Sequence, residues 1–308
     1  MSSSTTTTFT LPNTPSNIPI THPSTLTQDQ LLAFPAFKTW LSTLQRSLSL
    51  QHTSPSHPFH ESAYALRSIE IQSVDFFSGH RLGFLKLKAT VTNDKGESLP
   101  GSVFMRGGSV AMLIILTPSG QPSSRTTTTT TSKEPPQPED DDDEEYAILT
   151  IQPRIPAGSL AFAELPAGMI DDSGTFAGAA AKEIHEETGL EISTDELIDM
   201  TQLAASSLSL SLTDTREKSG SEEEQLQSAI YPSPGGSDEF IPIFLARKTL
   251  PRHQIEALKG KLTGLRDHGE KITLKIVKLN DVWKVAWRDG KTLAAMALYQ
   301  GLKGEGKL

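Results

Sequence analysis

The first third of the chain switches between helical and extended patterns of apolar residues. Residues 31–50 carry leucine and phenylalanine near helical spacing, and Pro35 interrupts the run, so we predict one or two helices there. Residues 65–75 and 82–91 alternate apolar and polar positions on either side of a Ser-Gly pair at 78–79. This alternation predicts two strands joined by a turn.

Later apolar runs have the length and composition of strands. They lie at residues 110–116, 146–156, 241–246 and 271–279. Residues 281–302 fit two terminal helices that separate at 289–290. Because strands and helices alternate along the chain, the fold class that we predict is an α/β sandwich.

One more helix is predicted after a polar loop at residues 171–174. Thr175 can cap its first turn, and the alanines and lysine within residues 177–182 favour helix by their intrinsic propensity. We expect this helix to end near Thr188, with Gly189 as its C-cap.

Three glutamates gather on one face of this predicted helix. At 3.6 residues per turn, Glu187 lies about 40° around the axis from Glu183, and Glu186 lies about 60° to the other side. Like charges at this spacing weaken a helix and call for a counter-charge. Clustered carboxylates suit Mg or Mn, and the absence of cysteine argues against a soft metal. The alternative is a solvated acidic helix face.

The loop before these glutamates, together with the helix, resembles the Nudix box. The matching positions, at the spacing of that family, are Gly168, Glu183, Ile184, Glu186, Glu187, Gly189 and Leu190. The chain departs from the family pattern at Gly174, where a glutamate is usual, and at Lys182, where an arginine is usual. The resemblance implies that Glu183, Glu186, Glu187 and the carbonyl of Ala167 hold divalent metal.

A second motif lies at residues 231–240, which read YPSPGGSDEF. This Pro/Gly-rich segment resembles the SPGG-x-x-E loop of the ADP-ribose and ADP-sugar diphosphatase branch of Nudix hydrolases. The resemblance implies that Glu239 is the general base or a further metal ligand. Glu187, by its place on the shared carboxylate face of the helix, is the second candidate catalytic residue. The alternative is a turn that carries an ordinary surface acid.

Candidate substrate-binding residues come from the same resemblance. Gln152 and Arg154 are similar to the QxR feature of this branch, and Arg106 and the ELPAG run that begins at Glu164 are also typical of it. A planar guanidinium grips phosphate oxygens at two points, so Arg154 suits a diphosphate. Either arginine could equally be a structural ion-pair partner.

Residues 264–270, GLRDHGE, together with the SPGG loop, resemble plant-type ADP-sugar diphosphatases. This resemblance implies a Nudix α/β/α sandwich with a mixed sheet, a small N-terminal β-rich subdomain and a homodimer. It also implies Mg-dependent (or Mn-dependent) hydrolysis of an ADP-sugar, ADP-glucose or ADP-ribose, to AMP and a sugar phosphate. Two alternatives stay open: a catalytically lapsed Nudix fold that binds a nucleotide or a protein, and a diphosphatase for another dinucleotide.

Composition excludes several other classes of protein. The net charge is −9 with no dense stripe of Lys and Arg, so the chain lacks the electrostatic footprint of a nucleic-acid-binding protein. It contains no cysteine for disulfides, and no apolar run approaches the roughly 20 residues that span a bilayer. We expect a soluble, cytoplasmic protein with no membrane partner, because the N-terminus makes a poor targeting signal.

The same composition predicts the domain boundaries. Residues 1–27 are rich in Ser, Thr and Pro and are expected to be a disordered tail. Residues 28–107 should form a subdomain of helices and strands, and residues 108–308 the Nudix domain. Within that domain, residues 117–145 and 213–227 have the polar, low-complexity composition of insertions.

Overall fold

The computed structural model of the protein describes residues 5–12, 17–119, 144–170, 175–213, 224–265 and 270–308. The chain divides into two compact units. The first unit comprises Met1–Ser109 and Ser206–Ile241, and the second comprises Val110–Ala205 and Pro242–Leu308.

The segment 206–241 belongs to the first unit. Backbone pairing explains this membership. The N–H of Phe104 donates to the carbonyl of Gly236 over 2.8 Å, and Phe104 and Ser237 form an isolated parallel bridge. Composition within the segment cannot reveal this pairing, because it depends on residues more than a hundred positions earlier.

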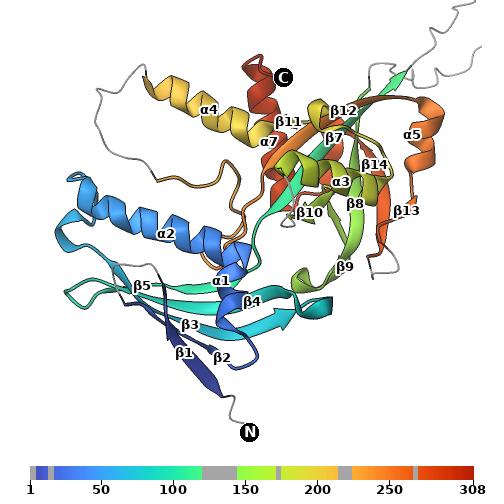
Figure 1. The fold of residues 1–308 in the computed structure, drawn as a ribbon. Helices are drawn as coiled ribbons and strands as arrows, with labels where there is room; N and C mark the ends of the chain where they lie inside the picture. The colour runs from blue at the N-terminus through green and yellow to red at the C-terminus, as the bar shows by residue number, and fades with distance from the viewer. Residues whose placement is uncertain (1–4, 13–16, 120–143, 171–174, 214–223, 266–269) are drawn as a thin grey trace, which may run out of the picture. The chain divides into compact units, whose positions relative to one another are not determined.

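The first unit is built on a sheet with two helices (Figure 1). Its elements are β1 (Thr6–Thr10), β2 (Pro19–Pro23), α1 (Gln28–Ala33), α2 (Pro35–Thr53), η1 (His60–Ser62), β3 (Ala65–Phe76), η2 (Ser78–His80), β4 (Leu82–Thr92), β5 (Ser98–Leu99) and β6 (Ser102–Met105). The strand order is β1-β2-β3-β4-β5, with β6 also paired to β4. The predicted strands at 65–75 and 82–91 are confirmed, and Pro35 begins α2.

The expected disordered tail is wrong for the described residues between 5 and 27. Strands β1 and β2 pair antiparallel, and β2 runs parallel to β3 with Ile20 opposite Ile69. Leu11, Ile18 and Ile20 are all buried. The few apolar residues of this segment suffice because strand pairing satisfies its backbone and each apolar side chain reaches an existing core.

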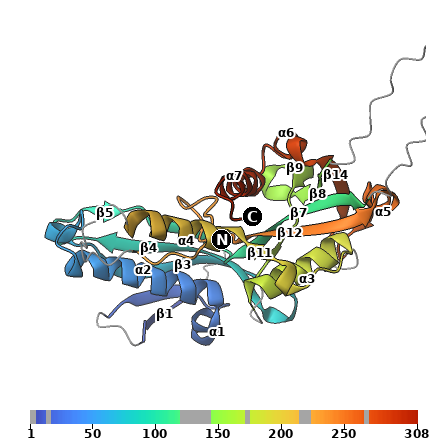
Figure 2. The ribbon, with the colours of Figure 1, turned by 90° about the horizontal axis from the view of Figure 1, so that it is seen from above.

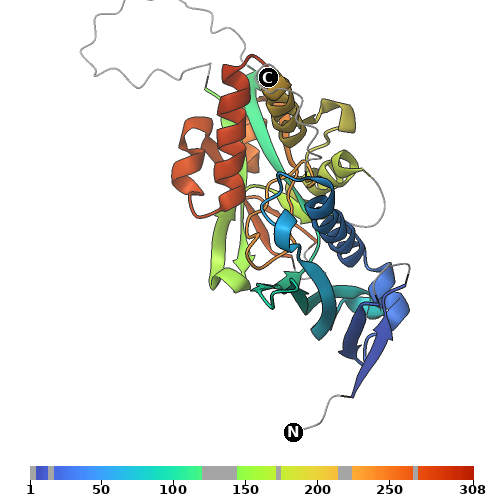
Figure 3. The same ribbon diagram turned by 90° about the vertical axis from the view of Figure 1, so that its left-hand side faces the viewer.

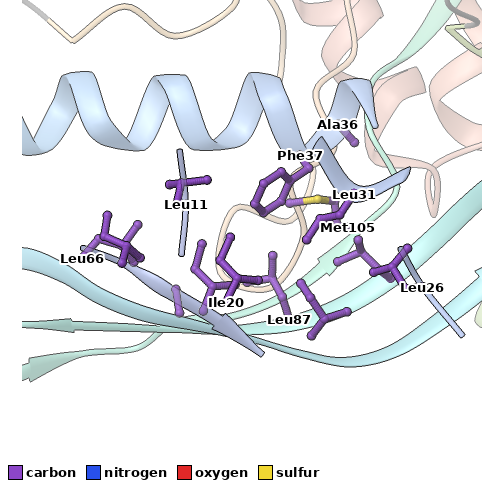
Figure 4. Close-up of a cluster of buried hydrophobic side chains, with 14 of the residues drawn as sticks. Leu11, Ile20, Leu26, Leu31, Ala36, Phe37, Leu66, Leu87 and Met105 are labelled. Carbon is purple, nitrogen blue, oxygen red and sulfur yellow. The ribbon is translucent and has the colours of Figure 1, made fainter. Parts of the chain in front are cut away.

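The core of the first unit lies between the helices and the sheet (Figure 4). Phe37 of α2 and Leu31 of α1 meet Leu87 and Met105 from the strands, and all four are at most 1 % exposed. Thr27 caps α1 through a capping box, which fixes where that helix begins.

The second unit contains the larger sheet. Its elements are β7 (Ser109–Ser119), β8 (Tyr146–Arg154), η3 (Ile155–Ala157), β9 (Ser159–Glu164), β10 (Ala167–Met169), α3 (Phe176–Thr188), η4 (Thr194–Glu196), β11 (Ile198–Asp199), α4 (Met200–Thr213), β12 (Ile243–Pro251), α5 (Arg252–Leu258), β13 (Leu262–Thr263), β14 (Ile272–Lys278), η6 (Leu279–Asp281), α6 (Val282–Val285) and α7 (Gly290–Gly304). Two of these elements, β7 and α4, extend across the unit boundary.

The second sheet is mixed and covered on both faces. Its order is β11-β12-β7-β8-β14-β13, with β9 paired to β8 and β10 to β7. The pair β12–β7 is parallel and the pair β8–β14 antiparallel. Figures 2 and 3 show α3 on one side of the sheet and α6 and α7 on the other. Residues 110–116 are wholly buried as a consequence, which explains their uninterrupted apolar sequence. The predicted α/β/α sandwich is confirmed.

The expected insertions fall largely outside the described residues. Strands β7 and β8 pair antiparallel through Ile115–Ala147 and Leu116–Tyr146, while residues 120–143 between them are not described. Residues 214–223 of the second expected insertion are likewise outside the description. None of the helices in the described ranges is both long and apolar enough to cross a lipid bilayer.

Candidate active site

Helix α3 begins and ends where the sequence predicts. The Thr175 side chain accepts a hydrogen bond from the N–H of Gly178, and Gly189 closes the helix with a φ of 75°. Ala180 and Ile184 pack on the core, and Glu187 follows on the same face. The helical period therefore turns one of the three glutamates into the interior of the second unit.

Glu187 and Glu183 both lie against strand β10, which precedes α3. The N–H of Ala167 donates to Oε2 of Glu187 over 3.0 Å. Gly168 lies so near Glu183 that a Cβ at residue 168 would meet the carboxylate carbon at 1.8 Å. Close approach of the side chain thus requires glycine at the first position of the box. Glu186 is partly exposed on the same helix.

The pKa of Glu187 is shifted by its burial and by the charges around it. Glu187 is 4 % exposed, and burial, together with the charges of Glu183 and Glu164, raises its pKa to about 8. The Ala167 N–H and Arg154 oppose this shift. A bound cation would relieve the repulsion that these carboxylates share.

Strands β8 and β9 supply the polar side chains next to this pair. Arg154 donates from Nε to Oε1 of Glu164 over 2.7 Å, and Lys291 also contacts Glu164. Thr150, directly opposite Glu164 across the strand pair, and Gln152 are buried. Thr150 Oγ1 and Gln152 Nε2 have no hydrogen-bond partner among the described residues, so polar groups of a ligand or water could meet them.

The donor set fits a hard divalent cation. Glu183 and Glu187 are brought together at one loop, and all the predicted ligands offer oxygen atoms. Across the described ranges, however, no three Asp, Glu or His side chains converge as they stand into a group that could hold a metal ion. The metal ligands Ala167, Glu183, Glu186 and Glu187 therefore stay predictions.

In the first unit, the predicted residues Arg106 and Glu239 are brought together. Nη1 of Arg106 lies 2.7 Å from Oε1 of Glu239, which also accepts a hydrogen bond from the Ser109 hydroxyl over 3.0 Å. Asp238 accepts from the N–H groups of Arg106 and Gly107, over 2.8 and 3.1 Å. Burial raises the pKa of Asp238, and these two N–H groups oppose that shift. The SPGG loop is thereby tied to residues 104–109.

The sequence did not indicate four residues of these two clusters. Asp238 and Ser109 hold the SPGG loop and its glutamate. At the start of α7, Lys291 contacts Glu164, and the Thr292 hydroxyl accepts a hydrogen bond from the N–H of Leu165. The sequence offered one signal for this second cluster: Asp289 stands where the capping residue of a predicted helix is expected.

Comparison with known proteins decides the family. A model of the NUDIX domain matches residues 139–296 of the chain. The protein belongs to the Nudix family. This Nudix protein is 34% identical over 272 residues to "Nudix hydrolase 14, chloroplastic" of Arabidopsis thaliana, with 88% of this chain and 71% of that protein covered. It is a hydrolase of the Nudix type, which acts on pyrophosphate bonds in nucleotide substrates.

Among solved structures, the Nudix chain resembles one titled as an ADP compounds hydrolase. That likeness has a TM-score of 0.42 and 16% sequence identity, and it covers 79% of this chain and 99% of the other. Nudix hydrolases generally use divalent metals such as Mg.

Proposed function

We propose that this Nudix hydrolase cleaves the diphosphate bond of an ADP-sugar, ADP-glucose or ADP-ribose, to give AMP and a sugar phosphate. The observation that carries this proposal is the pair Glu183 and Glu187: Glu183 lies against Gly168, and Glu187 accepts a hydrogen bond from the N–H of Ala167. The SPGG loop, with Glu239 ordered at its end, supports the ADP-sugar class.

Mg is the proposed cofactor, with Mn as its alternative, held by Glu183, Glu186, Glu187 and the carbonyl of Ala167. When bound, such an ion withdraws charge from a diphosphate and lowers the pKa of coordinated water. The protein contributes the fixed orientation of its ligands: the Ala167 N–H orients Glu187, and Gly168 leaves room for Glu183.

Arg154 is proposed to bind the diphosphate. It uses Nε for Glu164, and a guanidinium carries further N–H donors that can grip phosphate oxygens. Its side chain is 40 % exposed, so those donors are accessible to a ligand. Glu164 is 2 % exposed and paired with two cations, which indicates that it orients Arg154 more directly than it contacts substrate.

Glu239 is proposed as the general base, and Arg106 as a further substrate-binding residue. The Ser109 hydroxyl and Arg106 fix the Glu239 carboxylate in one orientation, as proton abstraction requires. Nε of Arg106 is buried and has no hydrogen-bond partner in the described part of the chain, which leaves it a donor for a ligand.

The second candidate function is a lapsed Nudix fold that binds nucleotide without cleaving it. Gly174 and Lys182, which depart from the box, favour it, while the fixed pair Glu183 and Glu187 favours hydrolysis.

A homodimer and a cytoplasmic location complete the proposal. Light scattering and a fluorescent fusion test these, with the plastid as the rival location because the Arabidopsis relative is named chloroplastic.

The deciding experiment is a substrate panel with product identification. The purified protein is incubated with Mg and, separately, ADP-glucose, ADP-ribose, GDP-mannose, UDP-glucose and NADH, and products are resolved by anion-exchange chromatography. We expect AMP and sugar phosphate from an ADP-sugar, and none after chelation of the metal. Tight nucleotide binding without turnover would establish the lapsed fold, and faster cleavage of NADH would move the assignment to another dinucleotide.

A further inference from the structure

Hydrogen bonds and an ion pair join the first turn of α7 to residues 164–165, which precede the Nudix box. Asp289 caps α7 by accepting hydrogen bonds from the N–H of Thr292 over 3.2 Å and from its hydroxyl over 2.6 Å. The N–H of Leu165 donates to both of these side chains, over 3.3 Å to Asp289 and 3.2 Å to Thr292. The helix cap is therefore also an anchor for a residue more than a hundred positions earlier.

Lys291 lies between two carboxylates in the same turn. Its Nζ is 3.0 Å from Oδ1 of Asp289, and it also contacts Oε2 of Glu164. All three side chains are nearly buried, at 11 % exposed for Lys291, 7 % for Asp289 and 2 % for Glu164. A lysine is rarely buried to this extent unless it is paired, so its position is defined by the two acids.

These contacts pass directly to the proposed metal ligands. Glu164 is held by Lys291, and Leu165 is held by Asp289 and Thr292. The carbonyl of Pro166 accepts a hydrogen bond from the N–H of Met112 on β7, and the next N–H, that of Ala167, donates to Glu187. Every residue from 164 to 167 is thus fixed through its backbone or its side chain.

Charge balance makes Lys291 important for Arg154 as well. Glu164 carries one negative charge and has two cationic partners, Arg154 and Lys291. Without Lys291, Arg154 would be the sole cationic partner shown for this buried carboxylate, and Glu164 would compensate more of the guanidinium charge. With Lys291 present, part of the Glu164 charge is compensated by Lys291, so more of the positive charge of Arg154 acts on a bound diphosphate.

We propose that Lys291, together with Asp289, is a positioning residue for hydrolysis: it holds Glu164 so that the Ala167 N–H stays on Glu187 and Arg154 stays available to the diphosphate. This inference rests on the proposed function. It assigns to the C-terminal helix α7 the fixing of residues 164–167, which lead into the Nudix box.

The test compares Lys291→Met with Lys291→Arg and with the control Lys284→Met. Lys284 pairs with Asp281 over 2.6 Å but is 58 % exposed, so it matches the pairing without the burial. Three kinds of quantity are measured on the full chain: the kinetic constants kcat and KM for ADP-ribose, the Mg concentration that half-saturates the thermal shift, and hydrogen–deuterium exchange of residues 160–169.

For Lys291→Met we expect kcat to fall by about 10- to 100-fold, as is typical when a residue that orients metal ligands is lost. The half-saturating Mg concentration should rise, and exchange should accelerate within 160–169 while α5 and α7 beyond its first turn stay protected. Lys291→Arg should recover most of kcat, because it restores the positive charge. Lys284→Met should match the wild type in all three quantities.

A double variant keeps the proposal testable even if Lys291→Met is too unstable to purify. Glu164→Gln/Lys291→Met removes both charges, so Glu164 is no longer a buried carboxylate that has lost Lys291, and Asp289 keeps the N–H groups of Leu165 and Thr292. We expect its kcat to be no lower than that of Glu164→Gln alone, since the two residues act as a unit. A kcat of the double variant clearly below that of Glu164→Gln would overturn the proposal.

Other outcomes are equally decisive. Unchanged kcat, Mg requirement and exchange in Lys291→Met would overturn the positioning role, and so would uniform acceleration of exchange across the chain, which would mean a purely structural lysine. If the wild type hydrolyses none of the nucleotides, the proposed function fails. The Mg and exchange measurements then still decide whether Lys291 positions the loop.

Discussion

Glu183 lies against the α-carbon of Gly168, and an added Cβ there would sit 1.8 Å from the carboxylate carbon and 1.9 Å from its nearer oxygen. A Cβ at residue 168 would overlap the carboxylate, so any residue other than glycine must displace either β10 or the glutamate. The contact joins two positions of the Nudix box that lie on different elements, Gly168 on β10 and Glu183 on α3.

Gly168→Ala should therefore lower both activity and stability. We expect a loss of about 1–3 kcal/mol in the free energy of unfolding, as for other overpacked sites, and a fall in kcat of about 10-fold or more, because a ligand is misplaced by an ångström or so. Denaturant unfolding and steady-state kinetics measure the two effects. The control is Gly178→Ala, whose Cβ would meet Thr175 at an ordinary 3.4 Å. That control should retain activity, and equal effects at both positions would contradict the close contact as the cause.

Glu187→Gln should remove nearly all activity and leave the fold intact. The glutamine oxygen can still accept the N–H of Ala167, but the negative charge that a cation requires is lost. We expect kcat to fall by about 100-fold or more. Glu256→Gln, in an exposed pair with Lys259, is the control. Turnover within a few-fold of wild type, with normal thermal unfolding, would show that the metal does not depend on Glu187.

The pH dependence of stability in the metal-free protein should reveal the same group. Burial raises the pKa of Glu187 to about 8, above the ordinary glutamate value of 4.5. The stabilising contribution of the protonated form is thus fully present below the unfolded pKa and is lost as the pH rises toward the folded value. Between about pH 5 and 8, the midpoint temperature of the wild type should fall relative to that of Glu187→Gln, which cannot ionise. A difference that stays constant over this range would argue against a buried, proton-binding Glu187.

Glu239→Gln should slow the chemical step more than it weakens binding. Glutamine keeps an acceptor for the Ser109 hydroxyl but cannot take up a proton as a base does. We expect kcat to fall by about 100-fold, while the dissociation constant for ADP-ribose in Ca, measured by calorimetry, changes only a few-fold. A larger change in affinity than in kcat would assign Glu239 to binding instead.

Ile20→Ala should destabilise the first unit, because this side chain is wholly buried opposite Ile69. Removing a large buried side chain typically costs about 2–5 kcal/mol. Thr7→Ala, at an exposed position of β1, should change the free energy of unfolding by less than about 0.5 kcal/mol. Equal stabilities of the two variants, measured in denaturant, would restore the expectation of a disordered tail.

The sequence alone determined those features that depend on neighbouring residues. The period of α3, its cap at Thr175 and its end at Gly189 follow from local propensity and from the conformational freedom of glycine. The strands at β3, β4, β8 and β14 follow from alternation and apolar composition, and the motifs were sufficient to indicate the family.

Tertiary structure decided what joins distant residues. Glu164 meets Lys291 across 127 positions, Glu239 meets Ser109 across 130, and β2 joins β3 although its own composition resembles a linker. Local periodicity carries no information about such pairs, because burial and ion pairing depend on which elements pack together and not on the residues beside them. The depth at which Glu187 is buried, and hence its raised pKa, is a property of the folded second unit alone.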